Sequence, residues 1–369
     1  MENPIRVLCV FSTLDRGGAE SMCMQLYRHI DRNKVQFDFV KHTSNIGAFE
    51  KEITKLGGIV YEAPRFEIRN LPRYYIWWNN HLKKHPEHQI IHGHYFTISA
   101  VYFKIAKGRG RITIAHIHAS TIRGRIKNHL VRNISKYADY AFACSFEAGK
   151  WVYHNRQFNV LHNAIDTNAF KYSPHIRKIV KNELGLSNDL VLGTVANFSS
   201  VKNPMGLIDI FLATRKITPN IKLVWVGDGK LRTAIEERLQ KEQIVDSVLL
   251  LGARSDVPRI LQAIDVFCLP SFNEGLPVSM IEAQAAGLPC CVSDAITREA
   301  DITGLCRFLP IDEPDVWAKV ISKENTNRLD VSEVIKKAGY DIKDTAESIQ
   351  NFYLTLSIGQ VSSESVVQV

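Results

Sequence analysis

Residues 270–289 read Pro-Ser-Phe-Asn-Glu-Gly-Leu-Pro-Val-Ser-Met-Ile-Glu-Ala-Gln-Ala-Ala-Gly-Leu-Pro, and this stretch decides the fold. The apolar run Val266–Leu269 before it predicts a buried strand. Pro277 suits the first turn of a helix, because the N–H that proline lacks has no partner there. Gly287 suits the residue just past the end of that helix. The chain here therefore runs from strand to loop to helix.

Two carboxylates stand in this stretch, Glu274 in the loop and Glu282 in the helix. In open α/β sheets, ligands bind at the carboxyl ends of the strands, where Glu274 is expected to lie. Glu282 follows Pro277 by about one and a half turns. A long ligand with hydroxyls at two places could contact both side chains. The alternative is that Glu274 is a solvated loop residue and Glu282 an exposed helix residue.

The motif Glu-x₇-Glu after a strand ending in Pro-Ser, with Glu-Gly-Leu-Pro and Glu-Ala-x-Ala-x-Gly-x-Pro, resembles the signature of glycosyltransferase family 4. The resemblance implies the GT-B fold, with two Rossmann-like, doubly wound α/β domains facing across a cleft. It also implies retaining transfer from a nucleoside diphosphate sugar, expected to be UDP-linked. Glu274 would contact the donor sugar, near backbone groups of Gly275 and Leu276. Glu282 would contact the ribose.

Composition is that of a globular chain of about two domains, with 369 residues, 45% apolar and 23% charged. No apolar run reaches about 18 residues, so no transmembrane helix is expected. The N-terminus, Met-Glu-Asn-Pro-Ile-Arg, does not resemble a signal sequence. The seven cysteines show no Cys-x-x-Cys spacing and lie mostly in apolar runs. We therefore expect reduced core cysteines in a cytoplasmic protein.

The positive charge is concentrated in the first half of the chain. Residues 1–168 hold 24 Lys and Arg against 13 Asp and Glu, whereas residues 169–369 hold 22 against 25. Nucleic acid, an anionic membrane surface or an acidic acceptor would each suit the basic half, and so would a solvated face. We expect an anionic membrane surface and no nucleic acid.

Strands and helices alternate from the N-terminus onward, which predicts a doubly wound parallel sheet. The run Ile5–Phe11 is the first expected strand, and Gly17 and Gly18 precede a helix. Glycines at a helix N-terminus let backbone N–H groups approach a phosphate, although a tight turn is the simpler interpretation. The family resemblance implies that Gly17 and Gly18 border the donor diphosphate and the acceptor.

The domain boundary is expected near Val160–Phe170, which resembles the family's interdomain element although His162 and Ala164 depart from it. We expect an acceptor-binding domain at 1–168, a nucleotide-sugar-binding domain at 169–344, and a flexible tail at 358–369. In the GT-B fold the last helix, here 345–357, crosses back onto the first domain.

Two His-x-His pairs, His92/His94 and His116/His118, end two predicted strands. Because side chains alternate along a strand, both members of a pair point to one face, and four imidazoles could hold zinc. No carboxylate or cysteine stands in local spacing, so we expect no metal. The resemblance implies that His118 lies by the sugar and phosphate, and that His92 and His116 are structural.

The segment Arg65–Asn80 packs seven Arg, Tyr and Trp side chains into 16 residues. If exposed, Trp77, Trp78 and the arginines would suit a membrane interface. Ordinary helix packing of the aromatic rings is the alternative.

In the family, the turn after the first strand of the second domain carries an Arg and a Lys that neutralise the donor diphosphate. Lys202 matches the Lys, but Asn197 stands at the Arg position. Neutralising the leaving diphosphate is central to this chemistry. Arg254, in a loop expected near the nucleotide, or His118 could supply the missing charge.

We therefore expect a glycosyltransferase that uses no cofactor or metal, acts on a polyprenyl-linked or saccharide acceptor, and lies on the cytoplasmic face of the cell membrane. It resembles most the bacterial branch that builds capsule, exopolysaccharide or O-antigen. Three alternatives remain open: a sugar-nucleotide epimerase or hydrolase on the same fold, a non-catalytic nucleotide-sugar-binding or scaffold protein, which Asn197 favours, and a nucleic-acid binder driven by the basic half. The expected catalytic residues are His118, Glu274 and Lys202, and the expected binding residues are Gly17, Gly18, Asn197, Lys202, Arg254, Glu274, Gly275, Leu276 and Glu282.

Overall fold

A computed structural model describes residues 3–94, 98–118, 131, 133–186, 189–274 and 276–357. The chain divides into two compact units. The first comprises Met1–Ala164 with Gly339–Val369, and the second comprises Ile165–Ala338. The division falls a few residues before the boundary expected at 168. The expected tail, 358–369, lies outside the described residues.

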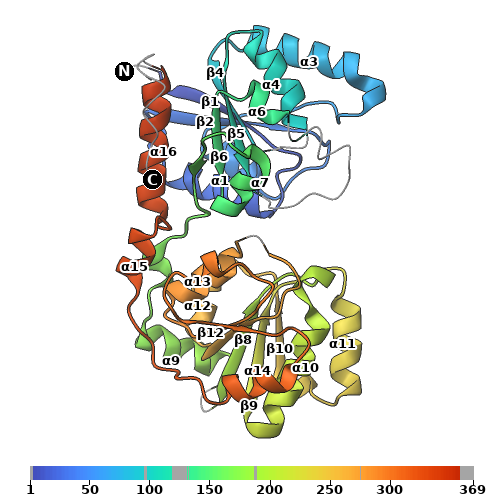
Figure 1. Cartoon of the computed structure of the whole chain (residues 1–369), viewed down its shortest axis with the longest axis vertical. Helices are drawn as coiled ribbons and strands as arrows, with labels where there is room; N and C mark the ends of the chain where they lie inside the picture. Colours follow the sequence, from blue (N-terminus) through green and yellow to red (C-terminus); the bar gives the residue numbers. More distant parts are fainter. Residues whose placement is uncertain are drawn as a thin grey trace. The chain divides into compact units, whose positions relative to one another are not determined.

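The first unit contains a seven-stranded parallel sheet in the order β3-β2-β1-β4-β5-β6-β7 (Figure 1). From β1, the chain builds outward to β3 on one side and then to β7 on the other, which is the doubly wound pattern. The strands are β1 (Ile5–Val10), β2 (Val35–Lys41), β3 (Val60–Glu62), β4 (His88–Gly93), β5 (Ile112–Ile117), β6 (Tyr140–Ala143) and β7 (Asn159–Val160).

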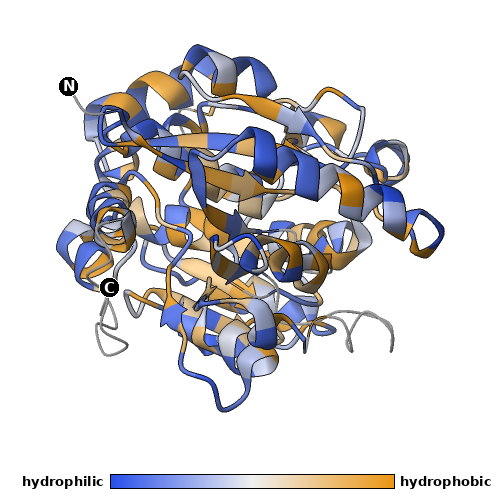
Figure 2. Ribbon diagram, turned by 90° about the horizontal axis from the view of Figure 1, so that it is seen from above, coloured by the Kyte–Doolittle hydropathy of each residue, from blue (hydrophilic) through white to orange (hydrophobic). Residues whose placement is uncertain are grey.

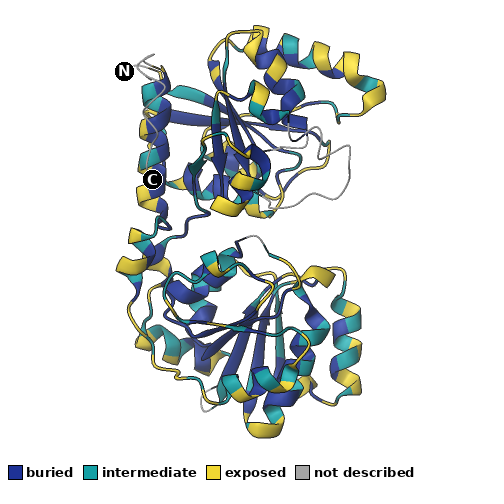
Figure 3. Ribbon diagram, viewed as in Figure 1, coloured by how far each residue is buried: buried dark blue, intermediate teal, exposed yellow. Residues whose placement is uncertain are grey.

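Helices cover both faces of this sheet, each over its own hydrophobic core. One face packs against α1 (Gly18–His29), α2 (Glu50–Lys55) and the last helix, α16 (Ile342–Ser357). The other face packs against α3 (Leu71–Lys84), α4 (Ser99–Lys107), α6 (Ile134–Tyr137) and α7 (Phe146–Tyr153). Phe352, Tyr353 and Leu356 of α16 are buried in the first core. In Figure 3 most strand residues are buried, and most exposed residues lie on the helices and loops.

The second unit contains a six-stranded parallel sheet in the order β10-β9-β8-β11-β12-β13, again doubly wound. Its strands are β8 (Leu190–Val195), β9 (Ile221–Val226), β10 (Val248–Gly252), β11 (Val266–Leu269), β12 (Cys290–Ser293) and β13 (Cys306–Leu309). Its helices are α8 (Thr167–Phe170), α9 (Pro174–Glu183), α10 (Pro204–Ile217), α11 (Arg232–Lys241), α12 (Val257–Leu261), α13 (Val278–Ala285), α14 (Pro314–Ile321) and α15 (Ser332–Lys337). Short 3-10 turns are η1 (Ile68–Asn70) in the first unit, and η3 (Ser200–Lys202), η4 (Val245–Ser247) and η5 (Arg298–Ala300) in the second.

The stretch 270–289 has the predicted local structure. The strand β11 precedes it, and α13 begins directly after Pro277. Gly287 has a φ of +68°, and a Cβ there would lie 2.4 Å from the carbonyl oxygen of Leu329. Both the left-handed backbone and the close approach exclude a larger residue. The predicted doubly wound α/β fold class is confirmed for both units.

Along the helices, hydrophobic residues alternate with hydrophilic ones, as one-sided packing on a sheet requires (Figure 2). None of the described helices is long and apolar enough to cross a membrane.

Candidate active site

The second sheet has its switch point between β8 and β11, because the chain leaves β8 toward β9 on one side and returns to β11 on the other. A switch point opens a crevice at the carboxyl ends of the strands, where ligands bind in this class of sheet. The loops that follow β8 and β11 are joined there, since the backbone N–H of Phe272 donates to the carbonyl oxygen of Val201 over 2.8 Å.

Lys202 and Glu274 meet at this switch point and form an ion pair. Their side chains are 20% and 14% exposed. Both are positioned by their surroundings. Lys202 ends η3, after which Asn203 adopts a left-handed backbone and its side chain accepts from the N–H of Gly206 at the start of α10. Glu274 forms a parallel bridge with Ile296 after β12. The structure therefore brings together two residues that the sequence places 72 positions apart.

Glu282 lies on α13, partly buried, and Leu276 is buried in the loop before that helix. Burial raises the pKa of the Glu282 carboxyl to about 7. A carboxyl that titrates near neutral pH in a sheet crevice is a candidate functional group. Gly275, predicted to lie near the sugar, is outside the described residues.

Asn197 and Arg254 do not add a charge to the Lys202–Glu274 pair. Asn197 is exposed and its Oδ1 accepts from the hydroxyl of Ser199 over 2.7 Å. Arg254 follows β10 at the edge of the sheet and binds both carboxylate oxygens of Asp256 at 2.8 Å. The expectation that Arg254 replaces the missing arginine therefore receives no support from this geometry.

Lys230 is a cation that the sequence analysis missed. It is exposed in the loop after β9, next to the turn Gly227-Asp228-Gly229. That loop is tied to the Asn197 turn, because the N–H of Phe198 donates to Asp228 and the N–H of Leu231 donates to Phe198. The turn Gly227-Asp228-Gly229 was the sequence signal that could have pointed to Lys230. The turn lies so close to the loop after β8 that it needs glycine, because a Cβ on Gly227 would lie 1.9 Å from the carbonyl oxygen of Ala196.

In the first unit, the corresponding switch point lies between β1 and β4. Gly17 precedes α1 and Gly18 is its first residue. A Cβ on Gly17 would lie 2.2 Å from a carboxylate oxygen of Glu20, whereas a Cβ on Gly18 would meet nothing within 4 Å. Gly18 therefore leaves open space at the start of α1, where backbone N–H groups can reach an anion.

His118 follows β5, and its Nε2 is hydrogen-bonded to Nδ1 of His94 over 2.9 Å. Burial lowers the pKa of His118 to about 3. The imidazole is therefore neutral at neutral pH, so His118 does not supply the positive charge that the sequence analysis considered. It remains available as a hydrogen-bonding group.

The first unit also has a cavity of about 800 Å³ at the carboxyl ends of β1 to β3. Arg65, Arg73 and Trp77 line one part of it, and the rest of the lining includes four hydroxyl side chains, the amide of Asn45 and the carboxylate of Glu62. The full lining is Ser12, Thr13, His42, Thr43, Ser44, Asn45, Glu62, Ala63, Pro64, Arg65, Arg73 and Trp77.

Comparison with known proteins identifies the family. The model for Glycosyltransferase Family 4 matches residues 16–169, and the model for glycosyl transferases group 1 matches residues 176–304. EpsF of Bacillus subtilis (strain 168), a protein assigned as a glycosyltransferase, is 31% identical over 368 residues, covering 94% of this chain and 96% of EpsF. The chain belongs to glycosyltransferase family 4.

This family 4 glycosyltransferase is also similar to an Escherichia coli UDP-Gal:alpha-D-GlcNAc-diphosphoundecaprenol alpha-1,3-galactosyltransferase, with 36% identity over 37% of each chain. Among solved structures, Anabaena HepE in complex with UDP matches with a TM-score of 0.77, at 17% identity, over 95% of this chain and all of that one. The two Rossmann-like units are therefore those of the GT-B fold.

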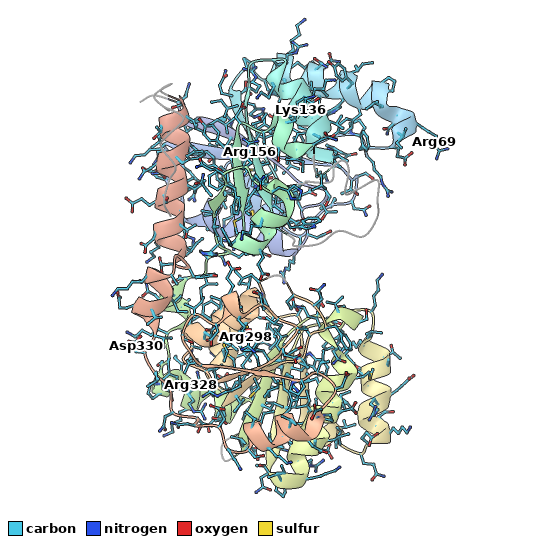
Figure 4. The ribbon with its side chains drawn as sticks, in the orientation of Figure 1. Arg69, Lys136, Arg156, Arg298, Arg328 and Asp330 are labelled. Carbon is cyan, nitrogen blue, oxygen red and sulfur yellow. The ribbon has the colours of Figure 1, made fainter. Side chains whose placement is uncertain are left out.

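In this glycosyltransferase the aromatic segment Arg65–Asn80 is divided between core and surface. Tyr74 and Trp78 are fully buried and Trp77 stacks on His81, so ordinary packing accounts for these rings. A different set is exposed around the start of α3: Ile68 (79%), Leu71, Tyr75 and Ile76 (58%). The side chain of Arg69 also projects away from the unit there (Figure 4). The exposed apolar residues of this segment are therefore not Trp77 and Trp78, the tryptophans considered for a membrane interface.

Proposed function

We propose that this glycosyltransferase moves a sugar from a UDP-linked donor to a lipid-linked acceptor, with retention of configuration, in the synthesis of a capsule, exopolysaccharide or O-antigen. The observation that carries the donor half of the proposal is the Lys202–Glu274 ion pair at the switch point of the second sheet. A cation and a carboxylate side by side suit a diphosphate and the hydroxylated sugar attached to it.

The proposed reaction breaks the bond between the sugar C1 and the oxygen of the leaving diphosphate. The acceptor hydroxyl oxygen forms the new bond to C1, and its proton passes to the leaving phosphate oxygen on the same face. Lys202 stabilises the negative charge that develops on the diphosphate. The N–H groups at Gly18 offer the first unit an anion site of its own. Glu274 orients the sugar, Glu282 binds the ribose hydroxyls, and His118 hydrogen-bonds near the reacting end. In this scheme the transfer step needs no metal.

Two relatives support the choice of donor and acceptor. The name of the E. coli protein gives UDP-galactose as its donor and a diphosphoundecaprenol-linked sugar as its acceptor. HepE was crystallised with UDP. Lys230 is the proposed second cation for the diphosphate, because its loop is hydrogen-bonded to the turn in which Asn197 stands.

The acceptor is proposed to bind the 800 Å³ cavity of the first unit. Arg65 and Arg73 supply the positive charge that the diphosphate of a lipid-linked sugar requires, and hydroxyls and amides can bind its sugar. The exposed Ile68, Leu71, Tyr75 and Ile76 are neighbours in the sequence of Arg65, Arg73 and Trp77, which line this cavity. Apolar side chains beside arginines suit the headgroup region of an anionic membrane, so a peripheral position on the cytoplasmic face is part of the proposal.

A thermal-shift panel of nucleoside diphosphate sugars tests the donor site. A ligand that binds only the folded protein raises the melting temperature by mass action. We expect a shift with at least one UDP-sugar that is lost in Glu282→Ala and kept in Glu347→Ala, an exposed glutamate on α16. No shift with any UDP-sugar, or an equal shift in Glu282→Ala, would contradict the proposed site.

A further inference from the structure

The core of the first unit brings two cysteines to the histidine cluster. Cys9 on β1, Cys23 on α1 and His94 after β4 are all buried, and one ligand atom from each lies within 4.8 Å of the other two. Cys9 also pairs in register with His92 on β4, so these two side chains point to the same face of the sheet. The cluster is lined by Phe11, whose ring stacks on His94 at 4.5 Å.

The histidines of this cluster have nitrogen atoms without partners. His94 and His92 are 5% and 1% exposed, and Nε2 of each is buried without a hydrogen bond. The other nitrogens are occupied: Nδ1 of His94 bonds His118 over 2.9 Å, and Nδ1 of His92 bonds the Tyr353 hydroxyl over 2.6 Å. Buried polar atoms are almost always satisfied, so an unpaired nitrogen on His94, grouped with two thiols, and another on the neighbouring His92 indicate a missing ligand.

We propose that Cys9, Cys23 and His94 bind a zinc ion in the core of the first unit, and that Nε2 of His92, which is not in this group of ligand atoms, moves in as the fourth ligand. Two thiolates and two imidazoles are a common tetrahedral zinc set. The choice of ligands follows from charge. Two thiolates neutralise Zn²⁺ once their protons have passed to solvent, whereas a site made only of His92, His94 and His116 would leave two positive charges in an apolar core.

The hydrogen bonds already present fit this role. A histidine that ligates a metal usually donates its other ring N–H to a neighbour, which fixes the ring orientation and leaves the lone pair on the ligating nitrogen. Donation from Nδ1 of His94 to Nε2 of His118 has this effect. The zinc would thereby hold His118, at the proposed reacting end, in a fixed orientation without itself contacting a substrate.

The site connects β1, α1 and the end of β4 around the turn that carries Gly17 and Gly18. The ligands come from three separate segments of the chain, and for this reason no local spacing motif in the sequence indicates them. This zinc is structural and separate from the transfer step, which is proposed to need no metal. A metal-free transfer reaction and a zinc-containing first unit are therefore compatible.

Metal analysis of the full-length protein, produced in zinc-supplemented medium and purified without chelator, tests the proposal. We expect about one zinc per chain in the wild type, loss of most of it in Cys9→Ser and Cys23→Ser, and retention in the control Cys291→Ala, a buried thiol of the second unit. Less than about a tenth of an equivalent of zinc in the wild type would overturn the proposal, as would a zinc content in both cysteine variants equal to that of the wild type.

A second measurement needs no variant and so does not depend on whether the cysteine variants fold. Replacing zinc with Co²⁺ in the wild-type protein should give the visible absorption of a tetrahedral ion and a near-ultraviolet thiolate-to-cobalt band. A cobalt complex without the thiolate band would exclude Cys9 and Cys23 as ligands. A Cys9–Cys23 disulfide in freshly purified, zinc-free protein would also overturn the proposal.

Discussion

Lys202 and Glu274 form an ion pair that joins the loops after two neighbouring strands, β8 and β11, at the switch point of the second sheet. Each residue also neutralises the other, because an unpaired charge at 20% or 14% exposure would be costly. A donor that binds there brings its own diphosphate to Lys202 and its own hydroxyls to Glu274. In the proposed function, a nucleotide sugar would therefore separate the two groups of this pair.

Removal of the lysine should impair transfer strongly. We predict that Lys202→Ala lowers kcat/KM for sugar transfer by about a hundredfold or more, the usual effect of losing one group that stabilises developing charge. Lys241→Ala, which removes an exposed lysine of α11, is the control and should change kcat/KM by less than about twofold. Steady-state kinetics with saturating acceptor would measure both. Similar values for the two variants would remove Lys202 from the proposed mechanism.

Glu282 should make stability depend on pH. Burial raises its pKa to about 7 in the folded protein, above the value of an unfolded glutamate. Below the unfolded pKa the carboxyl is protonated in both states and has no effect. As pH rises from the unfolded pKa to about 7, the unfolded chain ionises first, so the folded protein loses stability; above about 7 both states are ionised and the loss stays constant.

The variant Glu282→Gln removes this titration. We predict that the difference in melting temperature between Glu282→Gln and the wild type is a few degrees larger, in favour of the variant, at pH 8 than at pH 5. Glu347→Gln, at an exposed position of α16, should follow the wild type at both pH values. Calorimetry without nucleotide is the measurement. A difference between wild type and Glu282→Gln that does not change with pH would contradict the assigned titration.

The cavity of the first unit should select the acceptor. We predict that Arg65→Ala with Arg73→Ala raises KM for a diphosphate-linked lipid acceptor by about ten- to a hundredfold, because two charge-assisted contacts are lost. KM for the nucleotide sugar should be unchanged. Arg69→Ala removes a nearby exposed arginine that does not line the cavity, and should leave both values unchanged. A change in the KM for the nucleotide sugar alone would contradict the role of Arg65 and Arg73 in acceptor binding.

Membrane attachment should depend on the exposed apolar residues rather than on the tryptophans. We predict that Ile68→Ser with Ile76→Ser abolishes flotation with anionic liposomes, since both residues are more than half exposed. Ile217→Ser with Val245→Ser removes similarly exposed residues from the second unit and should float as the wild type does. Trp78→Ala is unsuitable for this test because Trp78 is fully buried and the change would destabilise the core. Wild-type protein that does not float at all would reject the membrane proposal.

Local patterns predicted the parts of the fold that depend on local chemistry. Pro277 before a helix and Gly287 after it mark α13 correctly, because the missing N–H and the left-handed backbone are properties of single residues. The helix α11 was not assigned, since only Ile235 and Leu239 of its ten residues are buried and the apolar stripe is short. The strand β13 is four residues long and carries an arginine, so its sequence gives little indication of a strand.

Sequence motifs predicted only part of the candidate site. Glu274 and Lys202 were found from their neighbours in the sequence, but their ion pair depends on the order of strands in the sheet. Lys230 and the group Cys9, Cys23 and His94 were missed because tertiary contacts, not spacing, bring them to their places. The suggestion that His118 could supply a charge is not supported, because the pKa of an imidazole depends on burial, which a sequence does not state.

The most direct test of the central claim is a transfer assay with a panel of UDP-sugars and a diphosphate-linked lipid acceptor, followed by nuclear magnetic resonance of the product. The account predicts acceptor-dependent release of UDP, a new glycosidic bond with the anomeric configuration of the donor, and loss of both in Lys202→Ala. UDP release that is independent of acceptor, or a product with inverted configuration, would contradict it.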